Sequence, residues 1–310
     1  MNTAVDASID GDGRTRVSLA ELIALRARVA RVKLPPERVH TARHGQQSSR
    51  LHGRGMDYAE SRAYQPGDDV RRLDWRLTAR SGRLHTKLFE EEREGRLLVV
   101  VDTNAGMRFG TRARFKSVQA ARAVALATWY AMRGGDKVGL IAFGGQRGQL
   151  RAQGAQRGAL AIAGALARWD AVGPVHGDET LAAALQRTGR AAHGARRVLV
   201  VTDGFSCDDA TRGSLLGVAR RAEVLLLGVS DALELNVPPA GRYPFAHNGE
   251  RFEVELHGQA QREAFAQAMG EGHRRLQSLA TELGLRHRII DTAADPLDGI
   301  AHLLGKGGPR

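Results

Sequence analysis

The 310-residue chain has few features that would cross-link it or anchor it in a membrane. Cys207 is the only cysteine, which excludes an internal disulfide and a zinc site built from several cysteines. The purely apolar runs are short, such as LLVVV at 97–101, and none approaches the roughly 20 residues of a spanning helix. The first 15 residues are polar and lack the layout of a secretory signal. We therefore expect a cytoplasmic protein without a membrane span.

The common catalytic motifs are missing too. The chain has neither the phosphate-binding G-x-x-x-x-G-K-[ST], nor a G-x-G-x-x-G opening a first βα unit, nor H-E-x-x-H. Cys207 has no evident base partner. The adjacent carboxylates Asp68 and Asp69 could form a paired-carboxylate site. The run Pro66-Gly67-Asp68-Asp69 is more simply interpreted as a turn before a salt-bridged strand. The sequence thus favours a protein that is not an enzyme.

Net charge is the next feature, and it is +12 at neutral pH. Such an excess raises the question of nucleic acid. The positive charge is spread along the chain, except in residues 38–54, where four arginines and three histidines meet no acidic residue. No aromatic platform is interleaved with them, so a solvated loop is the simpler interpretation and nucleic acid is an unlikely partner.

Apolar periodicity organises most of the chain. Ser18 and Glu21 form a capping box for a helix at 18–33. Beyond residue 96, continuous apolar strands alternate with helices, which indicates a mostly parallel sheet covered on both faces, a doubly wound α/β fold. The expected strands are 97–101, 137–143, 197–202, 223–229 and 286–290, and the expected helices are 114–132, 155–169, 179–192, 208–221, 259–283 and 296–304.

The same pattern divides the chain into segments. Residues 1–15 are expected to be a disordered tail and 306–310 a second tail. Residues 16–96 form an amino-terminal extension, and residues 97–305 form the α/β domain. Within that domain, 231–257 is interpreted as an insertion with a small β-hairpin, because prolines and the alternating run GERFEVEL interrupt the rhythm.

Residues 55–94 combine both charge signs with aromatic residues and a Pro-Gly turn. We interpret this block as a charge-paired layer packed against a core. Trp75 is expected to be largely buried, and Arg71 or Arg72 to pair with an acid of the block. The residues singled out are Tyr64, Gly67, Asp68, Asp69, Arg71, Arg72, Asp74, Trp75 and Arg80. The string YQPGDDVRRLDW followed by AR-x-G closely resembles the signature of the domain of unknown function (DUF) 58 family.

Polar residues follow two of the predicted strands. Asp102, Asn104 and Gly106 come directly after the first strand, and Asp203 follows a central one. This placement resembles the von Willebrand factor A fold, whose metal-ion-dependent adhesion motif reads Asp-x-Ser-x-Ser. The Thr of the fold's second motif element falls near Glu179 and Thr180. Counting back from Leu185 favours Glu179, and a shift by one residue restores Thr180.

The resemblance implies a metal site with altered ligands. Magnesium needs hard oxygens, and Asn104 could supply one, whereas Gly106 supplies none. Asp102, Asn104, Asp203 and Glu179 or Thr180 would remain to hold a weakly bound Mg²⁺. The simpler alternative is that Asp102 and Asp203 only cap turns and helix ends.

Together the two resemblances imply the function that we expect. Proteins of the DUF 58 family look like companions of MoxR-type AAA+ ATPases, as adaptors or chaperone-like assembly factors for client proteins. A non-enzymatic interaction module fits the missing catalytic sets. Two alternatives stay open: a divalent-metal-dependent hydrolase using the acidic cluster at the strand ends, and a basic nucleic-acid binder.

Overall fold

The computed structural model describes residues 10–32, 56–91, 95–173, 175, 177, 179–189, 194–247 and 250–305. The chain forms two compact units: residues 1–34 together with 95–310, and residues 35–94. The expected basic segment 38–54 and both expected tails lie wholly or mostly outside the described residues. None of the described helices is both long and apolar enough to cross a membrane.

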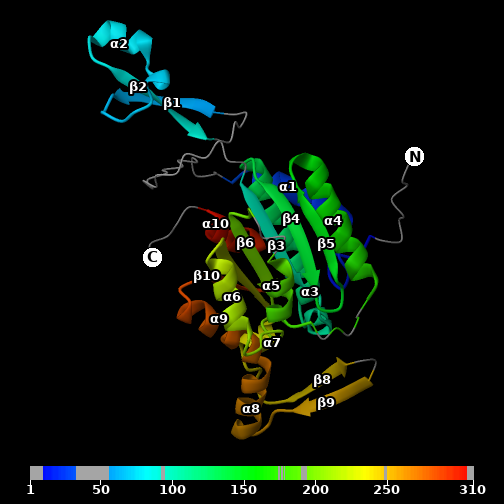
Figure 1. Cartoon of the computed structure of the whole chain (residues 1–310). Helices are drawn as coiled ribbons and strands as arrows, with labels where there is room; N and C mark the ends of the chain where they lie inside the picture. Colours follow the sequence, from blue (N-terminus) through cyan, green and yellow to red (C-terminus); the bar gives the residue numbers. More distant parts are fainter. Residues whose placement is uncertain are drawn as a thin grey trace. The chain divides into compact units, whose positions relative to one another are not determined.

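The larger unit is built on a six-stranded sheet in the order β10-β7-β6-β3-β4-β5 (Figure 1). All neighbouring pairs are parallel except β4 and β5. Strand bounds are β3 Arg96–Asp102, β4 Lys137–Phe143, β5 Gly148–Gln153, β6 Arg197–Thr202, β7 Glu223–Ser230 and β10 Arg286–Asp291. The predicted doubly wound α/β class is confirmed.

Helices cover both faces of this sheet, because successive side chains of each buried strand point to opposite sides. On β3, Leu97, Val99 and Val101 pack into one apolar cluster, and Leu98 and Val100 pack into another. Helices α1 Leu19–Ala30, α3 Lys116–Arg133, α4 Ala155–Ala171 and α10 Pro296–Leu304 contribute to the first cluster. Helices α5 Leu181–Thr188, α6 Thr211–Ala219 and α9 Glu271–Glu282 contribute to the second.

Helix α1 belongs to the sheet unit, which differs from the expected grouping of residues 16–96. Ser18 caps it as expected, accepting a hydrogen bond from the Glu21 backbone N–H at 3.2 Å. Its apolar side chains are buried against α3, and the Trp129 indole donates to the Leu22 carbonyl at 3.1 Å. Burial of one amphipathic face therefore ties α1 to the sheet unit.

Two elements differ from the sequence prediction. Strand β5 was not expected, because every second side chain is exposed and its sequence GQLRAQ lacks the continuous apolar run of a buried strand. The expected helix 259–283 is divided at Gly270 into α8 Gln259–Met269 and α9. The expected insertion contains α7 Ala232–Leu235 and a hairpin of β8 Arg242–His247 and β9 Glu250–Glu255. In Figure 1 this hairpin extends beyond the edge where β3 and β4 end.

The smaller unit has an antiparallel pair, β1 Met56–Ala63 and β2 His85–Glu91. Between them lie the 3₁₀ turn η2 Val70–Arg72 and the short helix α2 Trp75–Ser81. Gly82 ends α2 in the left-handed conformation, with φ of 68°.

A close approach of two backbones fixes the turn after β6. Gly204 has φ of +89°, and a Cβ atom there would overlap the backbone of Gly272 at the start of α9. We expect Gly204→Ala to lower the free energy of unfolding by about 2–3 kcal/mol, from the strained φ and the backbone clash. Gly213→Ala in α6 is the control, because no atom lies within 4 Å of its added Cβ. That variant should gain about 0.5–1 kcal/mol in urea unfolding. Equal stability of the two variants would contradict this close approach.

Candidate functional site

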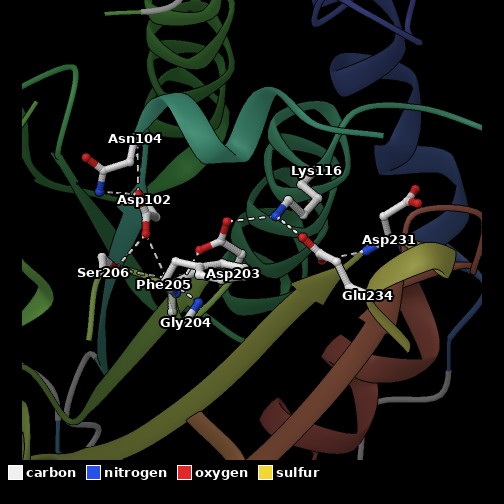
Figure 2. Close-up of polar contacts among 10 residues, drawn as sticks. Asp102, Asn104, Lys116, Asp203, Gly204, Phe205, Ser206, Asp231 and Glu234 are labelled. Carbon is white, nitrogen blue, oxygen red and sulfur yellow. Dashed lines mark hydrogen bonds and ion pairs between the residues drawn. The ribbon is translucent and has the colours of Figure 1, made fainter. Parts of the chain in front are cut away.

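The carboxyl ends of β3 and β6 meet at the point where the strand order reverses. The chain runs from β3 to β4 on one side, and β6 lies beside β3 on the other. This is where open α/β sheets bind ligands. Asp102 is the last residue of β3, and Asp203 directly follows β6. Both are buried, and Figure 2 shows that the structure brings these two predicted site residues together.

The Asp102 carboxylate is surrounded by four donors from the protein. The Asn104 backbone N–H and side-chain amide donate to Oδ1 at 2.9 and 2.8 Å. The hydroxyls of Thr202 and Ser206 donate to Oδ2 at 2.7 and 2.8 Å. Burial, and after it the charge of Asp203, raises the pKa of Asp102 to about 6, and the hydrogen bonds from Thr202, Asn104 and Ser206 offset only part of this rise. Both oxygens of Asp102 are thus used internally.

Lys116, the first residue of α3, supplies a cation at the site. Its ammonium lies 2.8 Å from Asp203 Oδ2 and 2.5 Å from Glu234 Oε1, and Figure 2 shows it between the two carboxylates. The side chain is buried, with the rings of Phe109 and Phe205 at 5.6 and 5.3 Å from the ammonium. Although burial disfavours the ammonium, the charges of Asp203 and Glu234 raise the pKa of Lys116 above its ordinary value.

Glu179 and Thr180 also have partners within the chain. Arg187 binds Glu179 through Nε and Nη2 at 2.9 and 3.2 Å, and Arg147 Nε lies 3.2 Å from Oε2. The Thr180 hydroxyl oxygen accepts from the Ala183 backbone N–H at 3.3 Å and so caps α5. Thr180 therefore serves the helix end.

These residues do not fit a magnesium ion. An ion of this type needs several oxygens free to face one cavity. The carboxylates of Asp102, Asp203 and Glu179 instead accept bonds from hydroxyls, amides, an ammonium and guanidinium groups. Gly106 adds no oxygen, although a Cβ there would have room, 3.5 Å from Asp203 Oδ2. Among the residues that the structure describes, no group of three or more His, Cys, Asp or Glu could hold a metal.

Sequence reasoning missed Lys116, Glu234 and Ser206. Glu234 completes a capping box with Asp231, and its carboxylate accepts a hydrogen bond from the Asp231 backbone N–H at 2.9 Å. One signal was available: a lysine in the first turn of an apolar helix is unfavourable with the helix dipole, so it calls for a local carboxylate. The partners themselves lie 87 and 118 residues away in sequence, which local patterns cannot reveal.

The signature segment lies in the smaller unit, and among its described side chains the expected charge pairing is found at one ion pair. Asp69 accepts from the Arg71 backbone N–H at 3.0 Å and so caps η2, while Asp74 accepts from Leu77 N–H at 3.0 Å and caps α2. Asp68 does form an ion pair, but with Arg62 at 2.7 Å. The carboxylates thus mainly satisfy helix ends, where backbone donors lack partners.

Trp75 is exposed, which contradicts the expectation. It is the first residue of α2 and 67% of its surface is accessible, while Leu73 takes the buried position. The expected turn is present: Gly67 has φ of 106° and the Asp68 N–H donates to the Gln65 carbonyl. A 3₁₀ turn follows it in place of the expected strand. The Tyr64 N–H donates to the Leu84 carbonyl at 2.9 Å. The side chain of Arg72 lies outside the described part of the chain, and Arg80 is exposed in the last turn of α2.

The fold and the site define a doubly wound α/β protein whose strand-end carboxylates accept hydrogen bonds or ion pairs from within the chain. Its family is shown by sequence. The profile of the family described as protein of unknown function DUF58 matches residues 60–275, and the chain belongs to this family.

Related proteins are similar in sequence over part of their length. Uncharacterized proteins of Mycobacterium tuberculosis and Mycobacterium bovis are 33% identical over 201 residues, which is 64% of this chain. The chain covers 62% of the length of these relatives.

The solved structures that match this chain do so distantly. An aerotolerance-related membrane protein from Bacteroides fragilis is 16% identical, with a TM-score of 0.43 over 68% of this chain and 96% of that one. A conserved hypothetical protein BatB from Bacteroides thetaiotaomicron is 16% identical, with a TM-score of 0.42 over 68% and 97%. A von Willebrand factor type A protein from Catenulispora acidiphila is 12% identical, with a TM-score of 0.38 over 70% and 42%.

Proposed function

We propose that this chain is a non-enzymatic protein-interaction module that acts as an adaptor or chaperone-like partner of a MoxR-type AAA+ ATPase. The observation that carries the proposal is the ion-paired centre of Lys116, Asp203 and Glu234. It leaves the strand ends with charges already satisfied and no open coordination position. Such a centre suits a rigid binding edge better than a reaction site.

The surface around this centre supports protein binding. Four large apolar side chains are exposed in the segments that follow β6 and β7 or in the hairpin, namely Phe205, Leu235, Val237 and Phe252. Clusters of exposed apolar side chains are typical of interaction sites, and we infer that these four belong to one. The hairpin is held by stacked rings: Phe245 lies 6.4 Å from Phe109 and 5.9 Å from Phe252. The rigid edge and the stacked hairpin together offer a preformed docking surface.

The chemistry near the site favours binding over catalysis. Cys207 is buried, and burial raises the pKa of its thiol to about 12, so the reactive thiolate is scarce at neutral pH. The hydrolase alternative would need free carboxylates around a metal, and it is tested by calorimetric titration with magnesium and manganese. The nucleic-acid alternative is tested by a salt-dependent mobility-shift assay.

The partner proposal is tested by co-purification with the cognate ATPase, in the presence and absence of EDTA. Leu235→Glu should weaken the complex at least about tenfold by burying a charge in the interface. Leu160→Glu is the matched control, because the two leucines have the same exposed fraction of 38% and Leu160 lies on α4. EDTA should have no effect, since the Asp203 and Glu234 carboxylates are paired with Lys116.

Three outcomes would contradict this proposal. Equal loss in both variants would remove the strand-end edge from the interface. If no ATPase co-purifies with the wild-type chain, the adaptor role is excluded. Loss of the complex in EDTA would favour the metal-dependent alternative.

A further inference from the structure

In the smaller unit, the signature segment exposes large apolar side chains at two nearby positions. Val70 begins η2 and Trp75 begins α2, and their exposed fractions are 61% and 67%. A tryptophan is the largest apolar side chain, and burying one side chain of this kind is worth several kcal/mol. Trp129 of the larger unit is buried, as is usual. The exposure of Trp75 therefore leaves a large contact surface without a partner inside the unit.

The same segment also carries unpaired positive charge. Among the described residues, the exposed side chains of Arg71, Arg76, Arg80 and Arg83 have no carboxylate partner. The three acids of this unit whose side chains are described, Asp68, Asp69 and Asp74, already accept bonds from Arg62 or from the backbone N–H groups of helix ends. The hydrogen bond from Arg62 and that from Leu77 N–H hold the pKa of Asp68 and of Asp74, respectively, below the ordinary value. These acids are not available to neutralise the arginines.

Helix α2 is held firmly enough to present these groups. Asp74 caps its start and also accepts from the Ser61 hydroxyl of β1 at 2.7 Å. Gly82 closes its end, and Leu73 pairs with Thr86 of β2. A short helix that is capped at both ends and attached to both strands loses little conformational entropy on binding. The geometry suits a preformed binding surface.

We propose that the exposed surface of Val70, Arg71, Trp75, Arg76 and Arg80 docks an acidic segment of a partner protein that also carries an apolar side chain. Exposed arginines recognise carboxylates through paired N–H groups, and an aromatic anchor surrounded by charge is a common centre of interfaces. This inference does not depend on the strand-end surface or on the identity of the ATPase.

Two other occupants fit less well. A single-stranded nucleic acid binds through several stacking rings along a basic groove. Among the described side chains of this unit, Trp75 is the one exposed large aromatic, and the other exposed large apolar side chains, Val70 and Leu84, are aliphatic and offer no stacking face. A second copy of this chain would bring the same arginines against one another, and the chain carries a net charge of +12. The acidic protein segment is the occupant whose charge complements the surface.

The test is a titration of the full chain with a synthetic peptide of four Glu-Glu-Leu repeats. Binding is followed by the shift of tryptophan emission to shorter wavelength and by anisotropy of the labelled peptide. We expect binding that weakens as salt is raised. Trp75→Ala and the double variant Arg76→Glu with Arg80→Glu should each reduce affinity at least about tenfold. Trp75→Ala should melt like the wild type, because the ring is exposed.

Matched controls separate charge from location and from chain composition. Arg157→Glu changes an exposed arginine of another helix, α4, and should leave the affinity unchanged. Peptides of Lys-Lys-Leu and of Glu-Glu-Ser repeats test the sign of charge and the apolar residue, and both should bind at least about tenfold more weakly.

Several outcomes would overturn the inference. These are unchanged affinity of Trp75→Ala, equal binding of the lysine peptide, tighter binding of oligothymidine than of the acidic peptide, or dimerisation that competes with the peptide. Because the readout uses no ATPase, failure here leaves the adaptor proposal intact, and failure of co-purification leaves this surface intact.

Discussion

Replacing Lys116 by methionine should lower the free energy of unfolding by about 3–5 kcal/mol, because it leaves the carboxylates of Asp203 and Glu234 buried without a counter-charge. Methionine keeps much of the apolar stem, so the loss reports on the charge. Urea unfolding at neutral pH measures it. The comparison is Arg212→Met, which breaks the exposed pair with Glu282 and should cost less than about 1 kcal/mol.

The same variant tests whether the Lys116 ammonium occupies the place that a metal ion could take beside these carboxylates. If the Lys116 ammonium neutralises the site, millimolar magnesium should raise the melting temperature of Lys116→Met more than that of the wild type, since the freed carboxylates can then attract a divalent ion. A wild-type chain that binds magnesium at micromolar concentration, with loss of that binding in Asp102→Ala, would contradict this account. Equal cost for Lys116→Met and Arg212→Met would contradict the burial of the pair.

Asp102→Asn should change how stability depends on pH. The pKa of Asp102 is about 6 in the folded chain, against an ordinary value of 3.8. A carboxyl whose pKa is raised by folding holds its proton more tightly when folded. Its stabilising contribution is therefore complete below about pH 4 and is lost as the pH rises through about 6. The loss amounts to about 3 kcal/mol at neutral pH.

Asparagine resembles the neutral acid and does not ionise, so the variant avoids this loss. It can accept from Asn104 and donate to the hydroxyls of Thr202 and Ser206, which then act as acceptors. The stability of Asp102→Asn relative to the wild type should thus improve by about 3 kcal/mol between pH 4 and pH 8. Urea unfolding of both proteins across that range is the measurement. A difference that stays constant with pH would show that Asp102 ionises as it does in water.

Periodicity predicted the sheet because its central strands are buried on both faces and are therefore continuously apolar, as in RLLVVVD at β3. The edge strand β5 alternates polar and half-buried residues, and its weaker pattern was missed. The break at Gly270 was missed because the apolar stripe continues on both sides of it. Strand positions followed from local patterns wherever burial was complete.

The site was harder to predict for a different reason. Local sequence placed Asp102 and Asp203 at the strand ends, because strand and polar residue adjoin in the chain. It could not indicate whether a carboxylate binds a metal, a distant lysine or a backbone amide. The same ambiguity applies to the signature segment, where Arg71 or Arg72 was expected to pair with an acid of the block, whereas Asp69 and Asp74 cap helices.

The chain order of α1 has a consequence for how the protein is made and shortened. Residues 1–34 and 95–310 form one unit, so residues 35–94 are inserted in it. A ribosome releases α1 well before α3, and the hydrogen bond from Trp129 to Leu22 closes a separation of 107 residues. Such long-range closure delays assembly. A truncated chain starting at residue 95 would lack the cover over α3 and expose an apolar face, so expression of the sheet unit alone requires residues 10–32 to be retained through a linker.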